Sequence, residues 1–138
     1  MIIADTGFWI ALFNRRDVYH TLAKQCLPIL PEPLVTTLPV MTETCYLLQQ
    51  QIGVTYAVAF LRGRRREVFN LFALDDNHLE RMADLMVRYS NLPMDFADAS
   101  LVILAESLGH GRILTTDRRD FSVYRWKDNQ VFNNLFFP

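Results

Sequence analysis

Short apolar runs alternate along this chain with longer segments in which apolar residues recur at helical spacing. The short runs carry β-branched and aromatic residues, which favour strands. We expect strands at Met1–Ala4, Leu34–Thr37, Glu67–Leu71 and Arg112–Thr116, and a last one near residues 130–137. Because one or two helical segments separate successive strands, the pattern predicts right-handed crossovers. The fold class is therefore α/β, with a mostly parallel central sheet covered by helices on both faces.

The helical segments have recognisable ends. Asp17 and Asp75 are candidate N-caps, Pro39 suits a first helical turn, and Gly109 ends the most apolar helix. We expect helices over residues 8–13, 17–28, 39–52, 55–62, 76–90 and 96–108. A loop is expected between Asp117 and the last strand.

Size and composition fit one globular domain spanning residues 1–138. Hydrophobic residues make up 51% and charged residues 21% of the chain, which excludes a disordered or fibrous protein. Cys26 and Cys45 lack the spacing of a disulfide framework or a zinc site, so we expect reduced thiols and a cytoplasmic protein. No signal-peptide pattern occurs, and no apolar run approaches the roughly 20 residues that cross a bilayer, so we expect no membrane segment.

Four carboxylates stand where an apolar segment gives way to polar residues. Asp5 and Asp117 end expected strands, and Glu43 and Asp98 lie near the starts of helices that face the same edge of the sheet. Gathered carboxylates stay charged together only beside a cation, and their hard oxygen atoms suit Mg²⁺ or Mn²⁺. We expect Asp5, Asp98 and Asp117 to bind the metal. Glu43 is expected to reach the ion or to hold the attacking water.

Other readings of these positions stay open. Each of the four acids also suits a helix cap, a turn or a solvated helix position. Thr6 and Thr116 are expected to bond to a ligand carboxylate or a metal-bound water, or else to cap strand ends. Asp95 is either an N-cap or a competitor of Asp98 for the ligand role, and Asp120 is a peripheral acid.

Four motifs around these acids carry a family resemblance. They are Ile3-Ala4-Asp5-Thr6-Gly7, Thr42-Glu43, Asp98-Ala99 and Leu114-Thr115-Thr116-Asp117-Arg118-Arg119-Asp120-Phe121. Over nearly the whole chain the sequence resembles a PIN domain, and within that superfamily the VapC-type toxin ribonucleases of prokaryotic toxin–antitoxin pairs. The resemblance implies a three-layer α/β/α sandwich and RNA cleavage at a Mg²⁺ or Mn²⁺ site formed by the four acids. It also implies a small antitoxin protein as partner and a homodimer.

Clustered arginines bear on the substrate. The net charge of −1 argues against a protein that simply coats nucleic acid, yet several arginines are neighbours in the sequence. Phosphate contacts from such groups give affinity without base identity. The candidates for RNA contact are Arg118, Arg119, Arg15, Arg16, Arg64 and Arg65, the last two within a run from Arg62 to Arg66. A solvated, solubilising surface is the alternative for this run.

The sequence thus predicts a metal-dependent endoribonuclease that is the toxin of a type II pair. A PIN nuclease that acts in RNA processing or on DNA without an antitoxin is an alternative, as is a non-catalytic RNA-binding module. A receiver-type phosphoacceptor domain is disfavoured, because Asp5 has no adjacent acid and no lysine occurs between Lys24 and Lys127.

Overall fold

The computed structural model describes all 138 residues, and its centre is a five-stranded sheet. The strand order is β3-β2-β1-β4-β7, and every neighbouring pair is parallel. The strands are β1 (Ile2–Ala4), β2 (Leu34–Thr37), β3 (Phe69–Phe72), β4 (Arg112–Leu114) and β7 (Asn133–Asn134). Every residue of β1 and β2 is buried, as expected for parallel strands that are covered on both faces.

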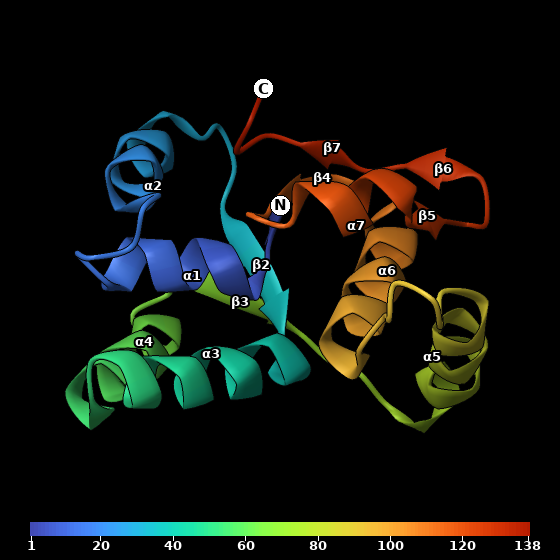
Figure 1. The fold of residues 1–138 in the computed structure, drawn as a ribbon, viewed down its shortest axis with the longest axis horizontal. Coiled ribbons are helices and arrows are strands. Elements are labelled where there is room, and N and C mark those ends of the chain that lie inside the picture. The colour runs from blue at the N-terminus through green and yellow to red at the C-terminus, as the bar shows by residue number, and fades with distance from the viewer.

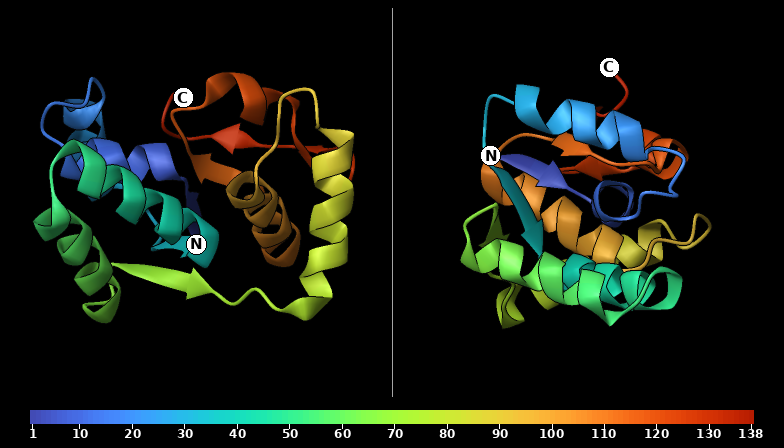
Figure 2. Two further views of the ribbon diagram at one scale, coloured as in Figure 1. Left: turned by 60° about the horizontal axis from the view of Figure 1, so that its bottom comes forward. Right: turned by 90° about the vertical axis from the view of Figure 1, so that its left-hand side faces the viewer.

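Helices occupy both sides of this sheet (Figure 1). They are α1 (Thr6–Phe13), α2 (His20–Cys26), α3 (Leu38–Gln51), α4 (Val54–Arg65), α5 (Asp76–Arg88), α6 (Phe96–Leu108) and α7 (Arg118–Val123). Helices α3 and α4 pack on β2 and β3, whereas α6 packs on β1 and β2. In the left view of Figure 2 the first four helices gather on one side and α5 and α6 on the other. The predicted α/β class with a mostly parallel sheet is confirmed.

An aromatic cluster joins α1, α4 and β3 in the core. The ring centroid of Trp9 lies 5.3 Å from that of Phe60 and 4.9 Å from that of Phe69. The Phe60 and Phe69 rings stack with their centroids 5.3 Å apart. All three side chains are buried, so packing of Trp9 fixes α1 against the sheet. Asp5 is the N-cap of this helix and is positioned with it.

Capping fixes where α6 begins and ends. Asp95 accepts a hydrogen bond from the Asp98 backbone N–H, and the Asp98 carboxylate reaches back to the Asp95 N–H. Gly109 ends the helix at φ 77°, a left-handed conformation that glycine adopts without strain. Asp98 therefore lies in the first turn of a buried helix, at a position that the capping exchange orients.

Two predicted segments differ from the structure. The helix expected over residues 17–28 is shorter, because Asp17 caps a turn by accepting from the Tyr19 N–H, and Leu27–Ile29 form a 3₁₀ turn after α2. The region expected to be a loop followed by one strand instead contains α7 and a hairpin of β5 (Arg125–Trp126) with β6 (Gln130–Val131), before β7.

Candidate active site

Seven carboxylates from five separate segments line one cavity of about 470 Å³ at the carboxyl ends of β1 and β4. They are Asp5, Asp17, Glu43, Asp95, Asp98, Asp117 and Asp120. The parallel sheet explains the gathering: Asp5 follows β1, and Asp117 lies just beyond β4 and caps α7. Helices α3 and α6 bring Glu43 and Asp98 to the same edge. The structure thus brings together all four acids expected from the sequence.

Asp5 is the most enclosed of these acids, at 7% exposure. One carboxylate oxygen accepts from the Thr6 N–H at 2.7 Å, and the other accepts from the Thr115 hydroxyl at 2.7 Å. Burial raises the pKa of Asp5 to about 6, while the bonds from Thr115 and Thr6 act in the opposite direction. Asp5 is therefore held in one orientation with its charge only partly compensated.

Asp98 is held by a second hydroxyl. Its Oδ2 accepts from the Tyr124 hydroxyl at 2.9 Å, and the Tyr124 side chain is fully buried. Burial, followed by the charges of Asp5 and Asp95, raises the pKa of Asp98 to about 8. Asp95 itself serves as the N-cap of α6 and also lines the cavity, so the two roles considered for it from the sequence are compatible in space.

Asp117 and Glu43 complete the cavity from opposite sides. Asp117 is the N-cap of α7, accepts from the Asp120 N–H at 3.0 Å, and donates its own N–H to Thr115 Oγ1 at 3.0 Å. The Glu43 carboxylate makes no hydrogen bond. Burial raises the pKa of both acids. For Glu43 the charges of Asp95 and Asp5 add to the effect, while the neighbouring Thr6 hydroxyl acts in the opposite direction.

The two threonines expected to support the site behave differently. The Thr6 hydroxyl is buried and has no hydrogen-bond partner, so it is available to a water molecule or another ligand in the cavity. Thr116 makes no bond to any carboxylate; its side chain packs so closely on Gly7 that any side chain there would collide with it. The bond to Asp5 comes from Thr115, one position earlier, because β4 ends at Leu114.

Thr115 and Tyr124 are site residues that the sequence reasoning missed. The motif Thr115-Thr116-Asp117 signals a hydroxyl near the acids but does not say which of the two threonines faces them. No comparable signal marks Tyr124, which reaches Asp98 only because α7 turns the chain back toward α6.

The donor set fits a hard divalent cation that keeps part of its water shell. The carboxylates of the cavity offer oxygen donors, and burial, with the charges of neighbouring acids, raises the pKa of Asp5 and Asp98. No group of three or more His, Cys, Asp or Glu side chains is close enough to enclose an ion. Mg²⁺ commonly takes one or two carboxylates and several waters, and the unpartnered Thr6 hydroxyl could bond such a water.

The candidate arginines occupy different surroundings. Arg119 donates to Asp120 at 3.1 Å and so borders the acidic cavity. Arg118 lies over the Phe137 ring at 3.6 Å and lines a separate small cavity with it. Arg64 and Arg65 lie at the end of α4, which leads into the amino end of β3. They are therefore at the opposite edge of the sheet from the acids, and the structure does not bring them to the site.

Comparison with known proteins identifies the family. The family model described as PIN domain matches residues 2–127. The chain belongs to the PIN domain family. Ribonuclease VapC26 of Mycobacterium tuberculosis is 30% identical over 124 residues, which cover 90% of this chain and 92% of that protein. The 23S rRNA-specific endonuclease VapC20 of the same organism is 32% identical over 100 residues, which cover 72% of this chain and 76% of that protein.

A solved structure shows the same architecture. The crystal structure of Mycobacterium tuberculosis VapC20, described as a sarcin–ricin loop cleaving toxin, superposes on this chain with a TM-score of 0.80 and 27% identity. The match covers 86% of this chain and 92% of the other. The resemblance to VapC-type PIN domains and the fold it implies are thus confirmed.

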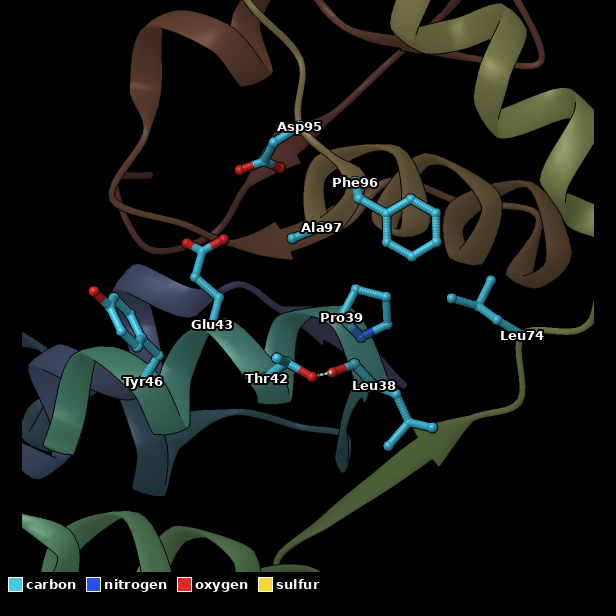
Figure 3. Close-up of a pocket in the computed structure, with 9 residues that line it drawn as sticks. All are labelled: Leu38, Pro39, Thr42, Glu43, Tyr46, Leu74, Asp95, Phe96 and Ala97. Carbon is cyan, nitrogen blue, oxygen red and sulfur yellow. Dashed lines mark hydrogen bonds between the residues drawn. The ribbon is translucent and has the colours of Figure 1, made fainter.

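This PIN domain has a second, mainly apolar cavity of about 740 Å³ beside the acidic one (Figure 3). Glu43 and Asp95 line both cavities. In Figure 3 their carboxylates lie at one side, whereas Leu38, Leu74 and Phe96 form the other. None of the helices in this fold is both long and apolar enough to span a membrane.

Proposed function

We propose that this protein is a Mg²⁺- or Mn²⁺-dependent endoribonuclease and the toxin of a type II toxin–antitoxin pair, with residues 1–138 forming one PIN domain. The observation that carries the proposal is the convergence of Asp5, Glu43, Asp98 and Asp117 on one cavity without a basic side chain to neutralise them. The names of the relatives, ribonuclease VapC26 and the rRNA-specific endonuclease VapC20, support RNA as the substrate.

Asp5, Asp98 and Asp117 would hold the ion, directly or through its waters. A bound divalent ion there would activate a water for attack and stabilise negative charge developing on the phosphate. The chain's own groups do the rest. Thr115 and Tyr124 orient the Asp5 and Asp98 carboxylates, so little reorganisation is needed when the substrate binds.

Glu43 is suited to act on the attacking water. Its carboxylate makes no hydrogen bond, and its raised pKa makes it a better proton acceptor than an ordinary exposed glutamate. In the proposed reaction Glu43 takes a proton as the water oxygen attacks phosphorus, and the bond from phosphorus to the leaving ribose oxygen breaks. Arg119, at the rim, and Arg118, on the same short helix α7, would contact the phosphates of the bound strand.

Two partners follow from the same proposal. A small antitoxin protein would neutralise the enzyme, and a second copy of the chain would form a homodimer in the cytoplasm. The relatives' VapC names support the first, and Tyr46, which lines the apolar cavity at 59% exposure, is among the side chains available to a protein partner. A chain purified alone that cleaves RNA, with no inhibitory protein encoded beside it, would favour an RNA-processing nuclease instead.

The decisive experiment incubates purified protein with total cellular RNA in the presence of Mg²⁺, Mn²⁺ or a chelator. Discrete fragments are expected with either metal and none with the chelator. Asp5→Asn and Asp117→Asn should each lower the cleavage rate by about 100-fold or more. The matched control is Asp84→Asn, which removes an exposed carboxylate of α5 that has no hydrogen-bond partner and should leave the rate unchanged.

Two results would overturn the proposal. Cleavage at full rate in the chelator, or by Asp5→Asn, would show that the acids do not serve a metal-dependent reaction. RNA binding without cleavage under any metal, equal in wild type and variants, would leave a non-catalytic RNA-binding module.

A further inference from the structure

A third cavity, of about 390 Å³, lies beside the end of α1 and adjoins the acidic one. Its walls are the turn after α1, the end of α3 and Tyr56 near the start of α4. Gln51 lines both this cavity and the acidic cavity, so the two are neighbours on the same side of the molecule. A strand bound across the acids can therefore continue into this third cavity.

The third cavity carries two arginines that make no ion pair within the protein. Arg15 and Arg16 line it, both are exposed, and neither guanidinium makes a hydrogen bond or ion pair. By contrast, Arg81, Arg112 and Arg119 are each paired with a carboxylate. The acidic cavity is lined by seven carboxylates, which repel a polyanion. The two unpaired guanidinium groups beside it supply the attraction for a polyanion that these acids lack.

The turn that presents these arginines is rigidly built. Asn14 is buried, donates from its side-chain amide to Gln51 Oε1 at 3.0 Å, and accepts from the Arg16 N–H at 3.0 Å. The Asn14 N–H also closes the end of α1 by donating to the Ile10 carbonyl at 2.8 Å. The amide nitrogen of Gln51 has no partner, so a donor remains for a ligand between the two cavities.

An aromatic ring completes the cavity. Tyr56 is 43% exposed, and its hydroxyl makes no hydrogen bond. Its side chain is therefore available to a ligand. Exposed rings of this kind stack on unpaired bases of single-stranded nucleic acid, and they accept every base because each has a π-face.

From this arrangement we propose a nucleotide subsite for a single-stranded or unstacked segment of the RNA substrate, next to the cleaved bond. Arg15 and Arg16 bind a phosphate that is not cleaved, Gln51 donates to the strand as it leaves the acidic cavity, and Tyr56 stacks on the adjacent base. The subsite rests on the proposed nuclease function. An acidic segment of a protein partner is negatively charged, as RNA is, but it has no base that could stack on Tyr56. Such a segment also has no reason to pass through the acidic cavity.

The test measures cleavage of an RNA oligonucleotide centred on a site mapped in cellular RNA. The double variant Arg15→Gln/Arg16→Gln should raise KM by about tenfold and change kcat little, and the slope of log KM against log salt should fall by about 1. The control, Arg62→Gln/Arg66→Gln, removes the same charge at the opposite edge of the sheet and should leave KM unchanged. Tyr56→Ala should raise KM about tenfold, whereas Tyr56→Phe, which keeps the ring, should not.

Abasic substitution tests the stacking directly. One abasic nucleotide is placed at successive positions beside the cut. For the wild-type enzyme it should raise KM at a single position only. For Tyr56→Ala it should not raise KM further at that position, because both changes remove the same contact. If KM of the arginine double variant and of Tyr56→Ala equals that of the control, the subsite is overturned while the nuclease function stands.

Two other outcomes separate this inference from its alternatives. If the wild-type protein cleaves no RNA, the proposed function fails, and the subsite is then tested by fluorescence anisotropy with a labelled 12-nucleotide single-stranded RNA. Weaker RNA binding by the arginine double variant and Tyr56→Ala than by the control supports the subsite. Equal binding overturns it. If poly-L-glutamate binding depends on Arg15, Arg16 and Tyr56 while abasic and intact RNA are cut equally well, the cavity takes an acidic protein segment and the RNA subsite is overturned.

Discussion

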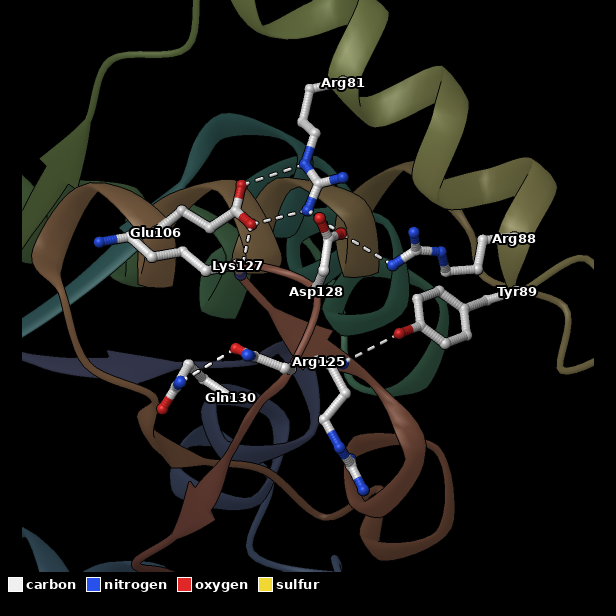
Figure 4. A network of polar contacts seen from close by, with 9 residues as sticks. Arg81, Arg88, Tyr89, Glu106, Arg125, Lys127, Asp128 and Gln130 are labelled. Carbon is white, nitrogen blue, oxygen red and sulfur yellow. Dashed lines mark hydrogen bonds and ion pairs between the residues drawn. The ribbon is translucent and has the colours of Figure 1, made fainter.

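Two clusters of charged side chains lie near opposite ends of α6, and they differ in how their charges are balanced. Near the C-terminal end, Arg81 of α5 donates to Glu106 at 2.8 Å and to Asp128 at 2.9 Å (Figure 4). Asp128 also accepts from Arg88 at 2.8 Å. These bonds, with Arg81 first, lower the pKa of Asp128, and they attach the β5–β6 hairpin to α5 and α6.

Near the N-terminal end of α6 the charges are almost all of one sign. Seven carboxylates line the acidic cavity, and the pKa of Asp5 and of Asp98 is raised, mainly by burial. The only ion pair there joins Asp120 to Arg119, which is itself 77% exposed. A cluster formed for stability has its counter-charges within the protein, as the Arg81 network does. The acidic cavity lacks them, which is what a cation-binding active site requires before the cation arrives.

The largest expected effect comes from Asp98→Asn, which should alter activity and stability in opposite directions. Cleavage should fall by about 100-fold or more, because an amide is a poor ligand for Mg²⁺ and lacks the negative charge. In chelator the variant should melt at a higher temperature than wild type at pH 8, because it no longer places an ionisable group in this site. Calorimetry in chelator and initial cleavage rates in Mg²⁺ measure the two effects.

The sign of the pH dependence follows from the raised pKa of Asp98. The unfolded chain ionises this group near 3.8 and the folded protein near about 8, so the folded state binds a proton that the unfolded state has lost. The stability of the metal-free wild type should therefore fall as pH rises from about 4 to about 8. The advantage of Asp98→Asn should grow over that range and level off above it. An advantage that is constant from pH 4 to pH 9 would contradict the assigned titration.

A change in the Arg81 network should lower stability and leave cleavage almost unchanged, the reverse of Asp98→Asn, and its effect should be smaller. Glu106→Gln removes the charge that pairs with Arg81 and should cost about 2 kcal/mol of folding free energy, since hydrogen bonds to charged groups contribute about that much. Cleavage in Mg²⁺ should stay within about twofold of wild type, because this network does not touch the acidic cavity. Chemical denaturation measures the first effect, and Asp84→Asn is the control. A variant that is fully stable but inactive would abolish the distinction between the clusters.

The sequence predicts the acidic cluster well because its signal is local. Asp5 and Asp117 follow apolar runs, and Glu43 and Asp98 lie in the first two turns of helices. In a parallel α/β fold those positions all face one edge of the sheet, so the alternation of strands and helices is enough to bring the acids together. The same alternation predicts the parallel sheet, since β1, β2 and β4 are short apolar runs with no competing helical pattern.

Other features of the site depend on contacts that no local pattern encodes. Thr115, not Thr116, reaches Asp5 because β4 ends at Leu114, and strand ends are not specified to within a residue by apolar patterning. The run around Arg64 and Arg65 is conspicuous in the sequence, yet its place at the far edge follows from the direction in which α4 leads into β3. Charge density alone does not say which edge a segment occupies.

The smallest expected effect concerns Tyr124, which binds Asp98 and is packed edge-on between Tyr89 and Phe121 at centroid distances of 5.1 and 5.0 Å. Tyr124→Phe keeps that packing and removes only the hydroxyl, so we expect cleavage to slow by about fivefold, the value of one ordinary hydrogen bond. The bond stabilises the ionised form of Asp98, so its loss should raise the pKa of this carboxyl further.

The acid limb of the pH–rate profile should therefore move to higher pH in Tyr124→Phe, because Asp98 then ionises only at a higher pH. The matched control is Tyr89→Phe, which removes a hydroxyl from the same aromatic group that accepts from the Arg125 N–H and does not contact Asp98. Both variants are expected to lower the melting temperature, but only Tyr124→Phe should shift the acid limb. Identical profiles for the two variants would reduce Tyr124 to a packing residue, and Asp98 would then be oriented by the capping exchange with Asp95 alone.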